Sequence, residues 1–125
     1  MKINLSDSEW KLMNRLWEHS PMTIMELTAA LKSDTGWSKN TVITMLSRLE
    51  AKGAIRHEEG VRAKQYFPAM IREDAALAET ESFLDKVYGG SLGLMMSAMV
   101  ENRALTEADI AELSAILEKA GGGEK

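Results

Sequence analysis

The stretch from Trp37 to Phe67 constrains the fold more than any other part of the chain. It reads WSKNTVITMLSRLEAKGAIRHEEGVRAKQYF. Apolar residues recur there at the i, i+3, i+4, i+7 spacing of one helix face, namely Val42, Met45, Leu46 and Leu49. Gly53 favours the left-handed backbone that ends a helix, and a short charged segment bends at Gly60 after it. The pattern therefore predicts a helix over residues 39–52 followed by a small β-hairpin.

The opposite face of this predicted helix carries small side chains and no acid. At about 100° per residue, that face presents Asn40, Ile43, Thr44 and Ser47. A helix face that meets only water usually carries pairs of glutamate and lysine instead. Small hydrogen-bonding groups around one apolar residue suit the base edges in a DNA major groove. Helix and hairpin together predict the recognition half of a winged helix-turn-helix.

The distribution of charge favours a nucleic-acid partner, although the net charge of the chain is −4. Residues 1–72 hold 11 Lys and Arg against 8 Asp and Glu, a balance of +3, whereas residues 73–125 hold 4 against 11, a balance of −7. Such asymmetry is typical of a basic binding module joined to an acidic arm. Two ordinary solvated surfaces are the alternative, and we favour the binding interpretation.

Capping patterns mark several other helix starts. A Ser or Thr followed three residues later by an acid occurs at Ser6, Thr23 and Thr106, and Ser38 precedes the helix described above. We expect a mainly α chain with helices over about 7–19, 24–32, 39–52, 73–88, 92–101 and 107–120, and strands over about 54–57 and 63–68. A turn is expected at residues 34–36.

The expected domains are a winged-helix DNA-binding domain over residues 1–72, a C-terminal three-helix dimerisation arm over 73–120, and a flexible tail over 121–125. The arm is too apolar and too short to be stable alone. Its candidate interface residues are Leu77, Phe83, Leu84, Val87, Tyr88, Leu94, Met95, Met99, Ile110, Leu113 and Leu117. A second copy of the arm would cover them, so we expect a homodimer. The alternative is that the arm folds back on the winged domain.

Candidate DNA contacts lie on the helix over residues 39–52 and on the hairpin. They are Ser38, Lys39, Asn40, Thr41, Ile43, Thr44, Ser47, Arg48, Arg62 and Lys64. Lys39 at the helix start suits a phosphate, and Asn40 suits an adenine edge. The hairpin cations can reach the DNA backbone or the minor groove. Each cation taken alone is more often a solvated charge, and Thr41 has local capping as an alternative role. As a set, these residues favour DNA binding.

Four segments give the chain a specific resemblance to a known family. LSDSEWKLMNRLWE resembles the first helix of the penicillinase-repressor family of bacterial transcription regulators, which has BlaI, MecI and CopY branches. WSKNTVITMLSRLEAKGAIRHE resembles its recognition helix and first wing strand, while FLDKVYGGSLGLMMSAMVE and LTEADIAELSAILEK resemble its dimerisation helices. The resemblance covers nearly the whole chain. It implies a homodimer that binds a palindromic operator in double-stranded promoter DNA and represses transcription.

Two departures from the family pattern bear on the inducing signal. The copper-responsive branch ends in a cysteine cluster, and this chain contains no cysteine, so copper sensing through that motif is excluded. The β-lactam-responsive branch is inactivated when a protease cuts an Asn–Phe bond in the helix that corresponds to residues 92–101. The aligned bond here joins Ala98 to Met99, so the asparagine is replaced. The apolar context of the bond is kept, so the resemblance implies a regulatory protease as a further partner, with Ala98 and Met99 as the aligned site, but without the asparagine control by the same protease does not follow.

The sequence offers no support for an enzyme. It contains no Ser/His/Asp set, Gly-rich phosphate loop or carboxylate pair in a catalytic setting, and we expect no cofactor. His19 and His57 lack a second histidine at ligand spacing, so we expect ordinary surface histidines and no metal. Without cysteine, a long apolar run or a secretory N-terminal segment, the chain is expected in the cytoplasm and away from membranes.

The leading hypothesis is a dimeric DNA-binding repressor whose inducing signal the sequence does not identify, and two alternatives to it remain open. One is a repressor gated by a small molecule that binds in the Met-rich segment Leu94–Met99. The other is a winged helix that docks proteins instead of DNA. A protein-docking face would be more apolar at its centre than the face around Asn40, which favours DNA.

Overall fold

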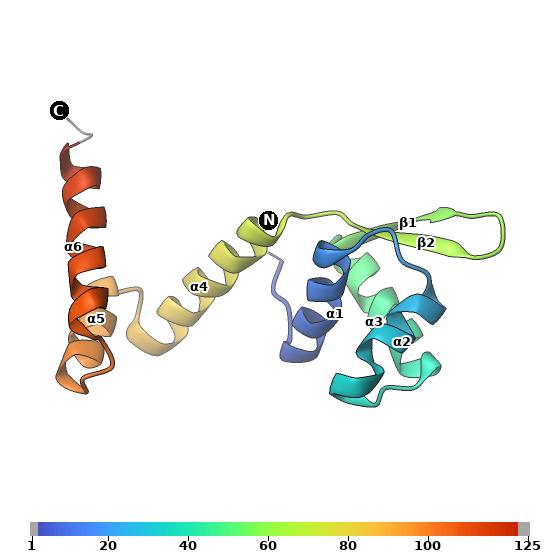
Figure 1. The fold of residues 1–125 in the computed structure, drawn as a ribbon, viewed down its shortest axis with the longest axis horizontal. Coiled ribbons are helices and arrows are strands. Elements are labelled where there is room, and N and C mark those ends of the chain that lie inside the picture. Colours follow the sequence, from blue (N-terminus) through green and yellow to red (C-terminus); the bar gives the residue numbers. More distant parts are fainter. Residues whose placement is uncertain (1–2, 123–125) are drawn as a thin grey trace. The chain divides into compact units, whose positions relative to one another are not determined.

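The computed structural model describes residues 3–122, and Figure 1 shows its elements. In chain order they are α1 (Asp7–Glu18), α2 (Ile24–Thr35), α3 (Lys39–Lys52), β1 (Ile55–Glu59), β2 (Lys64–Pro68), α4 (Arg72–Tyr88), α5 (Leu92–Glu101) and α6 (Glu107–Gly122). Three helices followed by a β-hairpin make a winged helix-turn-helix, and the expected mainly α fold is confirmed. The chain divides into a first unit that ends at Glu81 and a second unit that begins at Ser82.

The helix starts follow the capping patterns in the sequence. The Ser6 hydroxyl accepts a hydrogen bond from the Glu9 N–H (3.1 Å), and the Glu9 carboxylate accepts one from the Ser6 N–H (2.8 Å). The same reciprocal pair opens α2 at Thr23. It also opens α6, where Thr106 and Asp109 exchange two hydrogen bonds of 3.0 Å. These pairs satisfy backbone N–H groups that a helix start leaves free, which is why the predicted starts are confirmed.

The core of the first unit lies between α1, α2, α3 and the base of the hairpin. Its largest fully buried side chains are Leu12, Met13, Leu16, Leu27, Leu31, Val42, Leu46 and Leu49. The apolar stripe predicted on α3 is therefore confirmed, with Met45 also buried. Ala75 and Ala78 of α4 are buried too, and Ala75 joins the same core. The start of α4 thus packs as part of the first unit, while the domain boundary expected after residue 72 stays a prediction.

The expected turn at residues 34–36 is wrong at its first two positions. Asp34 and Thr35 continue α2, since the Thr35 hydroxyl donates to the Leu31 carbonyl (2.7 Å) and stabilises the last helical turn. Gly36 has a φ of 69° and donates its N–H to the Lys32 carbonyl at 2.8 Å, which ends the helix. Residues 36–38 alone separate α2 from α3.

The hairpin is anchored by a backbone contact that the sequence did not predict. β1 and β2 pair antiparallel, with Ile55 opposite Pro68 and Glu59 opposite Lys64. Tyr66 of β2 also exchanges two backbone hydrogen bonds with Met22, at 2.9 and 3.1 Å. The connection between α1 and α2 therefore adds a third short partner to the wing and fixes its base to the helical core.

The second unit contains the end of α4 together with α5 and α6. The bounds of α5 are those expected, and α6 extends through Gly121 and Gly122, two residues of the expected tail. The rest of that tail, residues 123–125, lies outside the described residues. No residue from Ser82 to Gly121 is buried in the single chain. Within residues 3–122 we find no helix that is both long enough and apolar enough to cross a membrane.

Candidate nucleic-acid interface

The outer face of α3 forms a shallow hollow. It has a volume of about 270 Å³ and is lined by Asn40, Thr41, Thr44, Met45 and Arg48. All of these except Met45 are exposed. The side-chain amide of Asn40 makes no hydrogen bond to any other described residue, so both its donor and its acceptor are available to a ligand.

Two hydroxyls near this hollow already have partners within α3. Thr44 donates its hydroxyl to the Asn40 carbonyl at 3.0 Å, which leaves its oxygen as an acceptor. Ser38 caps the helix by accepting from the Thr41 N–H at 3.2 Å, and the two side-chain oxygens lie 3.2 Å apart. Thr41 is therefore part of the cap, in agreement with the alternative role considered for it. Ile43 and Ser47 are exposed but do not line the hollow.

The first turn of α3 contains no acid, unlike the first turns of α1, α2, α4 and α6. Lys39 stands at this end and is exposed. Acids in a first helical turn compensate the partial positive charge of the free N–H groups. Without them, the start of α3 keeps that positive charge and a lysine beside it, an arrangement that favours an anion such as a phosphate.

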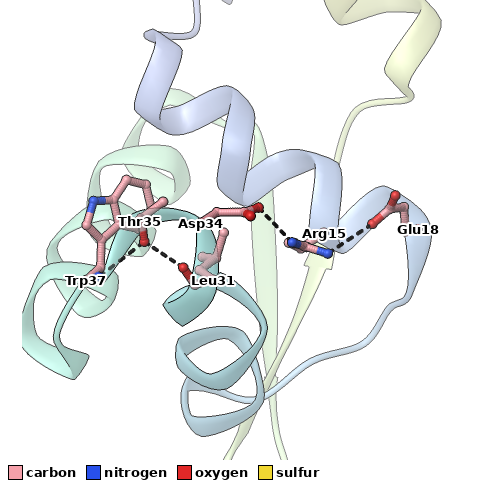
Figure 2. Close-up of polar contacts among 6 residues, drawn as sticks. All are labelled: Arg15, Glu18, Leu31, Asp34, Thr35 and Trp37. Carbon is pink, nitrogen blue, oxygen red and sulfur yellow. Dashed lines mark hydrogen bonds and ion pairs between the residues drawn. The ribbon is translucent and has the colours of Figure 1, made fainter.

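The turn that leads into α3 is held from two sides, as Figure 2 shows. Thr35 accepts a hydrogen bond from the Trp37 N–H at 3.1 Å, next to its own bond to Leu31. Asp34 pairs with Arg15 of α1 at 2.8 Å, and Arg15 also lies 3.8 Å from the Glu18 carboxylate. These contacts fix the end of α2 to α1 and therefore fix the direction in which α3 starts.

The other end of α3 is fixed by a lysine. Lys52 donates to the Glu9 carboxylate at 2.5 Å and to the Asn4 carbonyl at 2.8 Å. Glu9 is only 3% exposed. Burial alone would raise the pKa of Glu9, but the hydrogen bond and charge of Lys52, together with the Ser6 N–H and hydroxyl, outweigh it and hold that pKa below its usual value. Glu9 thus stays ionised and ties α1 to the last turn of α3.

A histidine joins α3 to the wing. His57 of β1 lies with Nδ1 2.5 Å from the Glu50 carboxylate, and its ring centroid is 5.7 Å from that of Tyr66 on β2. Burial, with the nearby charges of Glu50 and Glu59, raises the pKa of the Tyr66 hydroxyl. His57 is half-buried, so it is a structural contact between helix and wing rather than the ordinary surface residue that we expected.

The cations expected to meet phosphates are available for an external partner. Lys39, Arg48, Arg62 and Lys64 are all exposed, and none forms an ion pair with an acid in the described part of the chain. Arg56 differs from them, because it pairs with Glu58 at 2.7 Å and lies 4.2 Å from the Phe67 ring centroid. The structure thus places the ten candidate DNA-contact residues on two elements of the first unit, α3 with its cap and the wing.

One exposed residue of the wing was not among the expected DNA contacts. Val61 lies between β1 and β2 and its side chain is fully exposed. An apolar side chain between Gly60 and Arg62, at the bend of a predicted hairpin, was the signal that could have found it.

The candidate interface residues of the arm are exposed or half-buried in the single chain. The exposed ones are Leu77, Phe83, Val87, Leu94, Ile110 and Leu117, and the half-buried ones are Leu84, Tyr88, Met95, Met99 and Leu113. Ala98 is also half-buried, on α5. Within residues 3–122, no group of three or more His, Cys, Asp or Glu side chains is arranged to hold a metal ion.

Comparison with known proteins identifies the family. The model of the penicillinase repressor family matches residues 5–119. The chain belongs to the penicillinase repressor family. A curated member, the penicillinase repressor of Bacillus licheniformis, is 36% identical over 115 residues, which cover 92% of this chain and 90% of the relative.

Two solved structures of penicillinase repressors match the first unit. The solution structure of the DNA-binding domain of the repressor BlaI has a TM-score of 0.53 and 36% identity, and the match covers 59% of this chain and 93% of that one. The Bacillus licheniformis BlaI monomer in complex with the blaP half-operator has a TM-score of 0.52 and 36% identity, covering 58% and 90%. Both matches support the winged-helix fold described above for this member of the penicillinase repressor family.

Proposed function

We propose that this protein is a dimeric, sequence-specific transcriptional repressor that binds a palindromic operator with α3 in the major groove. The observation that carries the proposal is the outer face of α3 over residues 39–48, whose exposed side chains include no acid, on a helix that is fixed at both ends. A rigid helix with a free amide at Asn40 and a lysine at its start has the groups that read bases and hold phosphates.

The relatives support the same activity. A family member 36% identical to this chain is a penicillinase repressor, and a BlaI monomer has been solved with a half-operator. A half-operator is one of two equivalent sites, which suits a two-fold symmetric protein. We infer that each chain of a dimer occupies one half-site and that the half-sites are spaced by about one helical turn, or a multiple of it.

The exposed apolar residues of the arm support dimerisation. Leu94 is 60% exposed and Leu117 67% exposed, in a stretch from Ser82 to Gly121 that buries no residue in the single chain. Monomeric proteins rarely leave so many large apolar side chains in water along one short segment. A second arm is the partner that would cover them, and two joined DNA-binding units gain affinity because the second binding step becomes intramolecular.

Release from DNA is proposed to follow a change in α5, with cleavage between Ala98 and Met99 as the family-based route. The ligand-gated alternative has weaker support. A hollow on the arm has a volume of about 310 Å³ and is lined by Met96, Ser97, Val100 and Glu101, which all belong to α5. A hollow lined by one helix leaves a small molecule largely in water, whereas ligand sites normally enclose most of the ligand.

Selection of bound sequences from random DNA duplexes tests the proposal directly. We expect the full-length protein to enrich a palindromic site. An Asn40→Ala variant should lose the preference for one base pair in each half-site and bind the original site more weakly by about 1–3 kcal/mol. A selection that enriches no sequence would overturn the proposal. If the Asn40→Ala variant enriches the same site as the unmodified protein, α3 is not the reading element.

A further inference from the structure

The tip of the wing combines an apolar apex with free positive charge. Val61 is 104% exposed, the highest value among the exposed large apolar side chains of the described residues. It therefore contributes nothing to the core. Arg62 follows it and Lys64 begins β2, and both are exposed without an ion pair in the described part of the chain.

The acids near the tip do not neutralise these charges. Glu58 is engaged by Arg56 at 2.7 Å, and the Glu59 carboxylate lies 3.7 Å from Nε2 of His57. Both acids belong to β1, below the loop. The loop itself, residues 60–63, therefore presents one large apolar side chain, that of Val61, and one free cation, Arg62, to an approaching partner.

The loop that carries Val61 is tightly built. Gly60 donates its N–H to the Ala63 carbonyl at 3.1 Å and closes the turn. A Cβ at Gly60 would lie 2.3 Å from the same carbonyl oxygen, so only glycine fits without a shift of the backbone. A single exposed valine on a protein surface is ordinary. Val61 differs because the closed turn fixes its backbone at the apex, so its side chain and that of the unpaired Arg62 meet an approaching partner together.

We propose that the wing tip enters the DNA minor groove beside each half-site, where Val61 and Arg62 select A·T over G·C pairs. The inference rests on the proposed function, because it needs α3 to dock the protein on DNA. In the minor groove both A·T orientations offer only acceptors, to which an arginine can donate, whereas a G·C pair adds the guanine N2 amino donor. Facing Val61, that amino group would lose water without gaining an acceptor, which is unfavourable.

If the wing contacted only phosphates, the base pairs that flank the half-site would not affect affinity. Phosphate contacts need donors and positive charge but no apolar apex, and they carry no base preference. Base selection by Val61 would instead extend the recognised sequence beyond the pairs that α3 contacts. The two roles are therefore separated by measuring whether the pairs flanking the half-site matter.

Inosine makes the test specific for the minor groove. The full-length protein is titrated against three duplexes with the same selected half-sites and with flanks of A·T, G·C or inosine·C pairs. Inosine keeps the major-groove edge of guanine and lacks its N2 amino group. We expect the A·T and inosine·C flanks to bind alike and the G·C flank to bind more weakly, on the order of five- to tenfold. Equal binding to G·C and inosine·C flanks would contradict minor-groove selection.

Two variants assign the preference to Val61. Val61→Thr keeps the shape of the side chain but adds an oxygen that can accept from the guanine amino group, so the penalty on the G·C flank should fall to roughly twofold or less. Ile71→Ser, at another exposed apolar position outside the interface, should keep the full penalty. If Val61→Thr also keeps it, Val61 does not select bases.

The outcomes separate the two proposals. A protein that binds none of the three duplexes contradicts the proposed function and, with it, the inference about the wing. A protein that binds all three equally, and loses affinity when Asn40 is replaced, keeps the proposed function and contradicts only the inference about the wing. Because Val61 is fully exposed, its replacement should leave the circular dichroism spectrum and the melting temperature unchanged, which excludes a folding defect as the cause.

Discussion

At the scale of single residues, Thr44 and Thr80 provide a matched pair within one chain. Each is exposed and donates its hydroxyl to the carbonyl four residues earlier, at 3.0 Å for Thr44 and 2.8 Å for Thr80. Only Thr44 lies on the face proposed to meet bases. We expect Thr44→Ala to weaken binding to the preferred site by about 1–3 kcal/mol and Thr80→Ala to leave it unchanged, measured by fluorescence anisotropy.

Comparing Thr44→Ala with Thr80→Ala also separates a loss of DNA contact from a loss of protein stability. Both substitutions remove the same kind of local hydrogen bond, so their effects on thermal unfolding should be small and alike. Equal losses of DNA affinity in the two variants would show that Thr44 acts through the helix and makes no contact with the bases.

The Glu9 carboxylate makes the stability of the fold depend on pH. Its pKa is lower in the folded chain than in the unfolded chain, because Lys52 and Ser6 outweigh the effect of burial. A depressed carboxyl pKa contributes stability that is fully present above the unfolded value of about 4.3 and is lost as pH falls through the folded value. We expect Glu9→Gln to lower the free energy of unfolding at pH 7 by about 1–2 kcal/mol, measured by urea titration.

The same comparison at low pH tests whether the charge on Glu9 is the cause. The difference between the unmodified protein and Glu9→Gln should shrink as pH falls below about 4.3, since Glu9 is then increasingly protonated in both states. A difference that stays constant from pH 7 to pH 3 would mean that the charge on Glu9 does not stabilise the fold.

At the scale of elements, α5 is the proposed point of release. The Ala98 carbonyl, which belongs to the bond in question, accepts from the Asn102 N–H at 3.1 Å and from its side-chain amide at 2.8 Å. A protease binds an extended chain, so this end of α5 must unwind first. We expect that cutting an engineered protease site at Ala98 detaches α6, exposes Met95 and Met99, and dissociates the dimer, measured by size exclusion with light scattering.

Operator affinity should fall with the dimer, because the gain from joining two binding units disappears. The uncut engineered protein serves as the control for the inserted sequence. A cleaved protein that remains dimeric and keeps its operator affinity would remove α5 from the mechanism of release.

Local signals explain which elements could be predicted from sequence. Ser38 and Gly53 fixed both ends of α3, because a cap and a left-handed glycine act within a few residues. Thr35 was misplaced in a turn, since its hydroxyl bond to Leu31 depends on the helix already being formed. The face of α3 could be assigned from its 3.6-residue period.

Contacts between distant segments could not be predicted. Arg15 meets Asp34 across 19 positions and Lys52 meets Glu9 across 43. The bridge from Met22 to Tyr66 likewise exists only once helices and hairpin have packed. Nothing in the local pattern around these residues distinguishes their partners from other charged or strand-forming residues nearby.

At the scale of the whole molecule, assembly can be tested by truncation. Ala75 and Ala78 are buried with the first unit, so Glu81 is a better end for a shortened chain than residue 72. We expect residues 1–81 to sediment as a folded monomer with sharply reduced operator affinity, and the full chain to sediment as a dimer at micromolar concentration. A full-length chain that sediments as a monomer there would contradict the proposed dimer.

The free cations of the first unit predict a strong dependence on salt. If a dimer neutralises about four to eight phosphates, the slope of log K against log salt concentration should be roughly −4 to −7. Replacing Lys64 by alanine should weaken binding to all sequences about equally and make the slope less steep, by about one for each phosphate that the protein no longer neutralises. A flat salt dependence would argue against phosphate binding.

Because no residue from Ser82 to Gly121 is buried in the single chain, the activity of the protein would depend steeply on its own concentration. If its helices are covered only by a second chain, the amount of assembled repressor at low abundance grows with the square of the chain concentration. Halving the concentration of chains would then lower the concentration of the assembled form about fourfold rather than twofold. Genes under such a repressor would switch on more abruptly as it is diluted than genes held by a protein that binds one chain at a time.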